Sequence, residues 1–239
     1  MLNIKKSVKD LHIHSVKETF IMALNSYQVT VHGTAGLLCS NVQNSDPLGE
    51  GAKQKAFFSS KKKKNDEDHL CLRALDWVFS GYWKKEGKVK VNETKNSIEF
   101  DGFSDPYMPG ANFLRCLRNA ATKWKLGKDV LRSVVVTNDP LIEYEGSKDA
   151  LEMYTKDQSY FSNTAFTSRG VWVQRLLFPD WKCTFDVQVD DEILSVSQLN
   201  RIITMAGKAE GLGTWRPRFG RFESTPLTLK EKENAKSKN

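Results

Sequence analysis

The segment GLGTWRPRFGRFES, residues 211–224, brings together residue types that suit a phosphate-bearing polymer. Gly211 and Gly213 can adopt positive φ angles, which let a phosphate or a base come close to backbone N–H groups. Guanidinium groups match the geometry of phosphates, and aromatic rings offer stacking faces for bases. The segment therefore predicts a nucleic-acid-binding site whose side chains are Trp215, Arg216, Arg218 and Arg221.

A second interpretation of the same segment is purely structural. The glycines would end a helix, Pro217 would bend the chain, and an amphipathic strand with exposed arginines would follow. The order helix, glycines, strand reverses that of a dinucleotide-binding site, in which a strand leads into the glycines, so we expect no nucleotide cofactor. The spacing alone leaves the binding and structural interpretations open.

Two other basic segments are candidates for the same surface. A helix expected over residues 110–126 places Arg115, Arg118 and Lys125 on one side, at spacings of three or four residues and their multiples. The second segment is a run of four lysines, Lys61, Lys62, Lys63 and Lys64. It would clamp nucleic acid electrostatically, although a solvated, disordered run explains it equally well.

Composition points to a polyanionic partner. The chain has 239 residues, a formal net charge of +7 at pH 7 and a pI of about 9.1, and such a balance attracts nucleic acid over long range. No secretory signal and no long apolar run is present, so we expect a cytoplasmic protein with no membrane partner. The four cysteines are too widely spaced for a zinc site, and we expect reduced thiols and no metal.

Residue types that perform catalysis are sparse. His12 and His14 lie in an N-terminal extension, His32 follows an expected strand, and His69 starts an expected helix. The sequence has no nucleophile elbow, zinc-protease helix or Walker lysine loop. We therefore expect a non-catalytic protein without a cofactor.

Side-chain periodicity predicts a mixed α+β fold, with ferredoxin-like packing of helices against antiparallel sheets. Residues 27–224 are expected to form one domain, between an extension at 1–26, helical or disordered, and a disordered charged tail at 225–239. Strands are expected at 27–33, 87–91, 96–103, 129–146, 171–178, 181–191 and from 218, helices at 66–81, 110–126 and 193–207, and a flexible loop at 43–66.

The closing pattern resembles that of a group of uncharacterised bacteriophage-encoded proteins. The matching segments are FPDW at 178–181, ITMAG at 203–207 and GLGTWRPRFGRF at 211–222, with looser similarity from Tyr27 to Glu223. The helix, glycine loop and strand are also similar to the C-terminal glycine-rich loop of the RAMP superfamily, the ferredoxin-like RNA-binding proteins of CRISPR effector complexes.

The RAMP resemblance implies a sheet and a glycine loop that hold a single-stranded nucleic-acid backbone. It carries over to Gly207, Gly211, Gly213 and Gly220, and to the nearby arginines by proximity alone. We therefore expect non-catalytic binding of single-stranded DNA or RNA in phage biology, by a homo-oligomer along the strand or within a protein complex. Two alternatives are an interaction protein that inhibits a host defence complex, and a RAMP-like RNA endonuclease that uses His32 or His69 as general acid or base.

Overall fold

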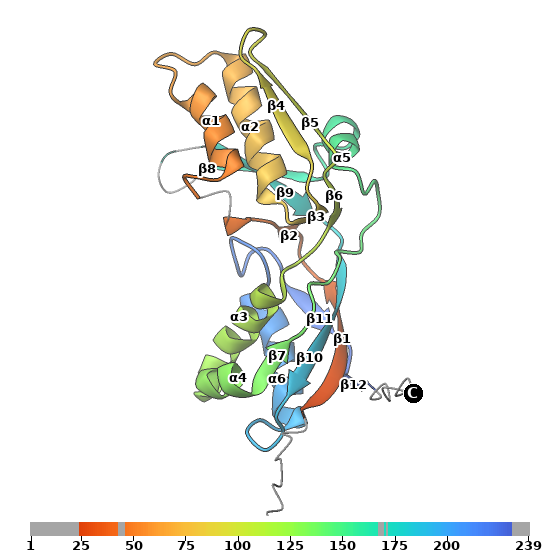
Figure 1. The fold of residues 1–239 in the computed structure, drawn as a ribbon. Coiled ribbons are helices and arrows are strands. Elements are labelled where there is room, and N and C mark those ends of the chain that lie inside the picture. The colour runs from red at the N-terminus through yellow and green to blue at the C-terminus, as the bar shows by residue number, and fades with distance from the viewer. Residues whose placement is uncertain (1–23, 43–45, 167–169, 171, 231–239) are drawn as a thin grey trace, which may run out of the picture.

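The structure is a computed structural model that describes residues 24–42, 46–166, 170 and 172–230, and these form two lobes stacked end to end (Figure 1). The lower lobe in that view we call the ferredoxin lobe. Its elements are β1 (Asn25–Gly33), α3 (Gly110–Ala121), α4 (Gly127–Ser133), β7 (Val134–Val136), β10 (Lys182–Val189), α6 (Val196–Met205), β11 (Phe222–Ser224) and β12 (Thr228–Leu229).

The ferredoxin lobe has the βαββαβ order β1, α3, β7, β10, α6, β11. Its sheet has the spatial order β11-β1-β10-β7, and all neighbouring strands are antiparallel. This is a ferredoxin-like arrangement. The predicted α+β fold with antiparallel sheets and packed helices is confirmed, but it is formed by segments that lie far apart in the sequence.

The upper lobe, which we call the insert lobe, comes from two insertions into that pattern, one between β1 and α3 and one between β7 and β10. Its elements are β2 (Leu37–Leu38), α1 (Glu50–Ser59), α2 (Asp66–Ser80), β3 (Trp83–Lys85), β4 (Lys88–Asn92), β5 (Ser97–Asp101), β6 (Ser104–Pro106), α5 (Ala150–Lys156), β8 (Ser162–Phe166) and β9 (Trp172–Phe178). Strands β2, β9 and β8 form one sheet, β3 pairs with β6, and β4 pairs with β5.

The core of the ferredoxin lobe follows from alternation along its two central strands. Tyr27, Val29 and Val31 point to one side of β1, opposite Val187, Phe185 and Cys183 of β10, and all six are buried. The ring of Phe113 from α3 stacks on Phe185 with centroids 4.4 Å apart. The main hydrophobic cluster continues through both lobes.

N-capping residues mark the starts of two of the expected helices. Asn65 caps α2 and Ser195 caps α6, each in a reciprocal capping box with the residue three positions on. Helix α6 was expected to close at Gly207, but the chain continues through a π-helical turn, Ala206–Glu210, before Gly211 turns with φ +76°. Gly207 instead packs against the backbone of Phe222.

The expected loop at 43–66 contains helix α1 in its described part. Local periodicity shows no helix in this segment, since Phe58 is the one large side chain of α1 that is fully buried. Phe58 packs with Cys71 and Leu75 of α2, so this tertiary contact supports a helix that local periodicity does not predict.

Three further expectations differ from the structure. The segment expected as strands at 129–146 begins inside α4, and only its valine run, Val134–Val136, forms a strand. The turn at Pro179–Asp180 connects the lobes, since β9 and β10 belong to different sheets. The tail expected from 225 adds β12 to β1, and residues 231–239 lie outside the described residues, as does most of the extension 1–26.

Within the described ranges, no helix is long and apolar enough to cross a membrane.

Candidate nucleic-acid interface

The segment between α6 and β11, residues 211–220, forms a compact loop that we call the glycine loop. Gly211, Gly213 and Gly220 all have positive φ angles, between 73° and 76°. A Cβ atom at Gly213 would overlap the carbonyl oxygen of Leu38, and one at Gly220 would overlap that of Leu212. These glycines are therefore required first by the path of the chain.

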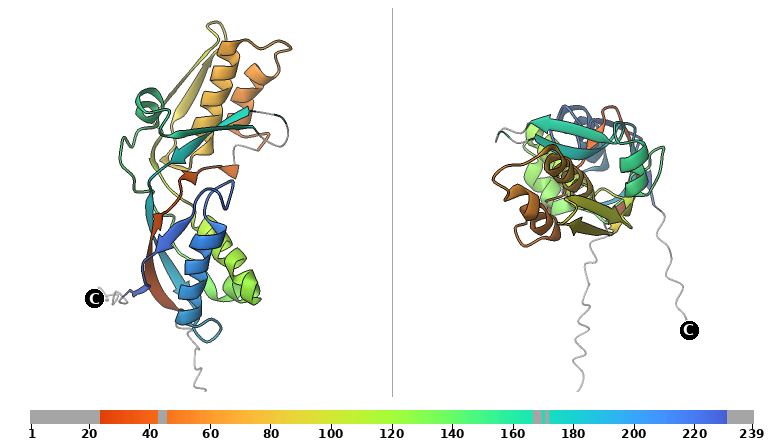
Figure 2. Two further views of the ribbon diagram at one scale, coloured as in Figure 1. Left: turned by 180° about the vertical axis from the view of Figure 1, so that it is seen from behind. Right: turned by 90° about the horizontal axis from the view of Figure 1, so that it is seen from above.

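The glycine loop joins the two lobes. Thr214 N donates to Leu38 O at 2.9 Å, and Gly220 N donates to Gly36 O at 2.8 Å. These bonds cover the edge of β2 that does not pair with β9. Figure 1 shows the loop, in the blue part of the colour bar, between β2 and α3, and Figure 2 shows the same neighbours from behind.

Some backbone amides of the loop are occupied within the protein. Gly211 N donates to Ala206 O at 2.9 Å, and Leu212 N donates to Gly220 O at 2.8 Å. The Gly211 and Leu212 amides are therefore not available to a ligand. The amides of Gly213, Trp215 and Arg216 donate to no acceptor in the described part of the chain.

The residues with these available amides line a polar hollow of about 430 Å³. Its wall consists of Ala209, Glu210, Gly213, Thr214, Trp215, Arg216 and Pro217. Successive backbone N–H groups in a turn make an anion-binding concavity, and the Arg216 guanidinium adds a positive charge. The hollow therefore suits one phosphate group on the side away from the Glu210 carboxylate.

The side chains of the loop divide by role. Trp215 is 37% exposed, and its ring centroid lies 6.4 Å from that of Phe219. The Arg218 guanidinium lies 5.7 Å from the Phe219 ring, and Arg218 is exposed. Arg221 is exposed, but its Nε donates to Pro217 O at 2.8 Å. Trp215 and Arg218 are thus exposed, Arg216 is partly buried in the wall of the hollow, and Arg221 is held by a bond within the loop.

Helix α3 contacts the beginning of the glycine loop. Cys116 Sγ donates to Gly211 O at 3.2 Å, and burial raises the pKa of this thiol to about 12, so it keeps its proton. Arg115 and Arg118 flank Cys116 in the sequence and are exposed. Among the predicted binding residues outside the glycine loop, Arg115 and Arg118 therefore lie on α3, the helix that packs against the loop.

Lys125 is not aligned with those arginines by helical spacing. Helix α3 ends at Ala121, a 3₁₀ turn follows at Thr122–Trp124, and Lys125 itself has φ +63°. Its side chain is exposed at the end of α3 that leads into α4. The unbroken helix expected over residues 110–126 is therefore wrong in its last turn.

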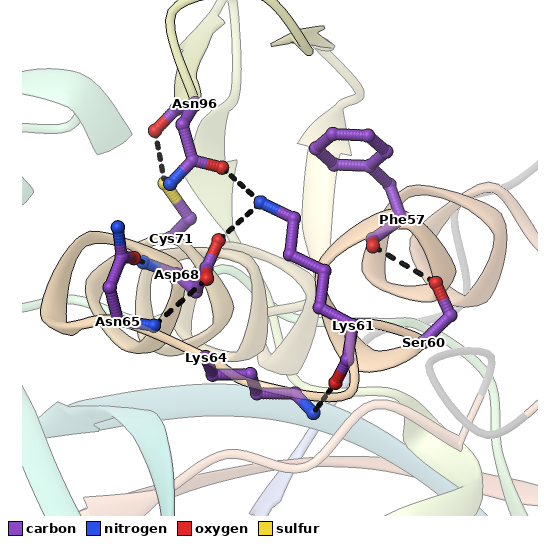
Figure 3. Close-up of polar contacts among 8 residues, drawn as sticks. All are labelled: Phe57, Ser60, Lys61, Lys64, Asn65, Asp68, Cys71 and Asn96. Atoms are coloured by element: carbon purple, nitrogen blue, oxygen red, sulfur yellow. Dashed lines mark hydrogen bonds and ion pairs between the residues drawn. The ribbon is translucent and has the colours of Figure 1, made fainter.

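The lysine run lies at the end of the insert lobe away from the glycine loop (Figures 1 and 2). Lys61 bonds to Asp68 of α2 and to Asn96 of the β4–β5 turn, and Lys64 Nζ donates to Lys61 O at 2.9 Å (Figure 3). Lys61 and Lys64 thus stabilise the turn between α1 and α2. Lys62 and Lys63 are exposed, and the structure does not bring them to the loop.

We expect Asp68→Asn to lower the unfolding temperature at neutral pH. Hydrogen bonding from Lys61, followed by that from the Asn65 backbone and Asn96, holds the pKa of this buried carboxyl below its usual value. Its stabilising effect is complete above the unfolded pKa of about 4 and disappears as pH falls through the lower folded value. Thermal unfolding of wild type and Asp68→Asn, measured from neutral to acidic pH, should show that the difference between their unfolding temperatures becomes smaller.

Asp66→Asn is the matched control for that experiment, because Asp66 lies exposed in the same helical turn. A difference between wild type and Asp68→Asn that stays constant down to acidic pH would contradict the assigned ion pair.

The structure does not assemble a histidine pair. His32 is exposed on β1, in the ferredoxin lobe, and His69 is exposed on α2, in the insert lobe. In the described ranges, no group of three or more His, Cys, Asp or Glu side chains could hold a metal ion. His12 and His14 lie outside the described residues.

The outer face of the ferredoxin sheet is polar. Thr30 and Thr184 hydrogen-bond across β1 and β10 at 3.0 Å, and Lys230 forms an ion pair with Asp186 at 2.5 Å. Gln28 also bonds to Asp186. No Phe, Tyr or Trp projects from this face of β1 and β10, and the aromatic side chains of the glycine loop are Trp215 and Phe219.

Neither a protein-family model nor a curated protein matches the chain. Among solved structures, it is similar to a chain from a "Type IV-B CRISPR Complex", with 8% identity and a TM-score of 0.41. The likeness covers 89% of this chain and 93% of that chain. At this score it carries no argument about function, and membership of a phage-encoded family or of the RAMP superfamily stays a prediction.

Proposed function

We propose that the protein binds single-stranded nucleic acid across the glycine loop. The observation that carries this proposal is the hollow in which the Gly213, Trp215 and Arg216 amides are available beside a guanidinium group. A phosphate of the strand binds there, and Arg218 provides a second cationic contact. Arg115 and Arg118 of α3 extend the contact along the backbone.

A single strand fits this arrangement better than a duplex does. Exposed Trp215 and half-exposed Phe219 offer stacking faces next to the phosphate contacts. Bases of a duplex are already stacked on each other, whereas those of a single strand can stack on aromatic side chains. The strand is DNA or RNA. That the protein is encoded by a phage and acts in the cytoplasm is part of this proposal, and it rests on the sequence alone.

A direct test measures the affinity of the purified protein for labelled single- and double-stranded DNA and RNA by fluorescence anisotropy. If four arginines, Arg115, Arg118, Arg216 and Arg218, each neutralise a phosphate, the slope of log affinity against log salt is about −3 for single strands. The affinity should then fall about 50-fold between about 50 mM and about 200 mM salt. No binding, or binding independent of salt, would overturn the proposal.

A further inference from the structure

Two helices of the ferredoxin lobe carry cations that no carboxylate neutralises. The segment 110–124 forms α3 and its 3₁₀ turn, and the segment 196–210 forms α6 and its π-helical turn. Together they contain five cations, Arg115, Arg118, Lys123, Arg201 and Lys208, and one acid, Glu210. All five cations are exposed, and none forms an ion pair with a residue that the structure describes. Solvated surfaces usually carry both signs of charge interspersed, so this set indicates an anionic partner.

The two segments lead away from the glycine loop side by side. At one end, Cys116 of α3 donates to Gly211 O and lies near Ala206 O, where α6 runs into the loop. At the other end, the Arg201 guanidinium lies 4.5 Å from the centroid of the Trp124 ring. Trp124 follows Cys116 by eight residues, which corresponds to about 12 Å along a helix. Figure 2 shows α6 beside α3 on one side of the sheet, which we call the helical side.

Cations lie along the helical side between those two ends. Lys208 directly precedes Ala209, which lines the polar hollow. Arg201 lies seven residues before Lys208, which is about two helical turns and about 10 Å along the axis. Lys123 also approaches the Trp124 ring, with its Nζ atom 5.9 Å from the centroid. The positive charges therefore continue from the hollow to the far end of α3.

Trp124 holds Arg201 in a position suited to phosphate binding. A guanidinium over an aromatic face is attracted by the ring and keeps its N–H groups available at its edge. The Arg201 guanidinium donates no hydrogen bond to any residue that the structure describes. Because the ring restricts this long side chain before a ligand arrives, less conformational entropy is lost on binding.

The outer face of the sheet offers less to a phosphate backbone. Its lysines are already neutralised, since Lys182 pairs with Glu143 at 3.0 Å and Lys230 pairs with Asp186 at 2.5 Å. Glu223 of β11 is exposed beside β1 and adds a negative charge. Affinity for nucleic acid depends on cations that can replace the counterions of phosphates. The helical side provides such cations, and the outer face does not.

We propose that the single strand continues from the glycine loop over the helical side, with phosphates bound by Lys208, Arg201 and Lys123. The inference rests on the proposed function and extends it. It differs from the RAMP resemblance, which implies that a sheet holds the strand. The ligand class is a phosphodiester backbone, recognised by charge and not by base, so these contacts add affinity for every sequence.

The test compares wild type with the double variant Lys123→Gln and Arg201→Gln, using labelled single strands of about 4 and about 16 nucleotides. The short strand fills the hollow without reaching Trp124, so we expect both proteins to bind it equally. The long strand should bind the double variant about tenfold more weakly, with a salt slope smaller in magnitude by about 1.4, because two phosphate contacts are lost. Arg201→Lys keeps the charge and should keep the slope.

Lys182→Gln with Lys230→Gln is the matched control, because it removes the same two charges from the outer face of the sheet. We expect its affinity for the long strand to stay within about threefold of wild type. Thermal unfolding of each variant should match that of wild type at the exposed positions Lys123 and Arg201. A larger loss in the control than in the first double variant would place the strand on the sheet and overturn the inference.

Two further results would overturn the inference while leaving the proposed function in place. One is wild-type affinity of the first double variant for the long strand. The other is an equal loss for the short and long strands, which would indicate long-range attraction without a contact. Absence of binding by wild type would overturn the proposed function and this inference together.

Polyglutamate with the same number of charges as the long strand separates a nucleic acid from an acidic protein. We expect it to bind wild type more weakly than the strand, because it has no bases to stack on Trp215. If it binds as tightly and loses the same factor in the Lys123→Gln and Arg201→Gln variant, the helical side takes an acidic protein and the inference is wrong.

Discussion

Replacing Arg216 and Arg218 together by Gln is expected to weaken binding to single-stranded nucleic acid about 100-fold at low salt. Each charge-assisted phosphate contact contributes about 1.5 kcal/mol, and about 3 kcal/mol corresponds to about two powers of ten in affinity. The salt slope should fall in magnitude by about 1.4, because two phosphate contacts are lost. Anisotropy titrations at several salt concentrations measure both quantities.

Lys62→Gln with Lys63→Gln is the matched control for the double arginine variant. It removes the same two charges from exposed positions at the other end of the insert lobe. We expect its affinity to stay within about threefold of wild type, since only long-range attraction changes. Equal losses in both double variants would show that binding follows net charge and would contradict a site at the glycine loop.

Arg221 is left out of the double variant because of its structural contacts. Its side chain holds Pro217 O, and its own carbonyl oxygen accepts hydrogen bonds from Thr34 N and Ala35 N. Replacing it would change the shape of the loop as well as its charge.

Gly220→Ala is expected to lower the free energy of unfolding by about 3–4 kcal/mol. The residue has φ +73°, and the added Cβ would overlap the Leu212 carbonyl. The left-handed conformation costs an alanine about 1–2 kcal/mol, and overpacking adds about 1–3 kcal/mol. Calorimetry should show the unfolding temperature falling by about 10 °C, at about 2–4 °C per kcal/mol for a chain of this size.

Gly102→Ala separates the two parts of that effect. Gly102 has φ +79°, but a Cβ there would meet only Gly87 Cα, at 3.4 Å. The conformational penalty remains and the clash does not, so we expect a loss of about 1 kcal/mol. If both variants lose the same stability, backbone conformation alone accounts for the effect, and the overlap with the Leu212 carbonyl matters little.

Local elements were predictable because their signals are local. The alternation of Tyr27, Val29 and Val31 identified β1, and the caps at Asn65 and Ser195 marked the starts of two helices. The strands expected at 87–91 and 96–103 also formed, as β4 and β5, which pair with each other. Each signal depends on residues only a few positions apart.

Strand pairing was not predictable in the same way. Consecutive elements in the first half of the sequence were expected to make the ferredoxin-like unit, but the β10 partner of β1 lies more than 140 residues away. Alternation shows which face of a strand is buried but not which strand lies beside it. Only the folded chain separates β9 from β10 and builds the insert lobe.

For the candidate site, the sequence by itself determined the residue types: glycines, arginines and a tryptophan in one short segment, with further arginines in a second basic segment. The tertiary structure decided their roles. It occupies the Gly211 and Leu212 amides, ties Arg221 to Pro217 and places the lysine run away from the loop. Hydrogen-bond occupancy and burial depend on neighbours distant in the sequence, so spacing within a segment cannot reveal them.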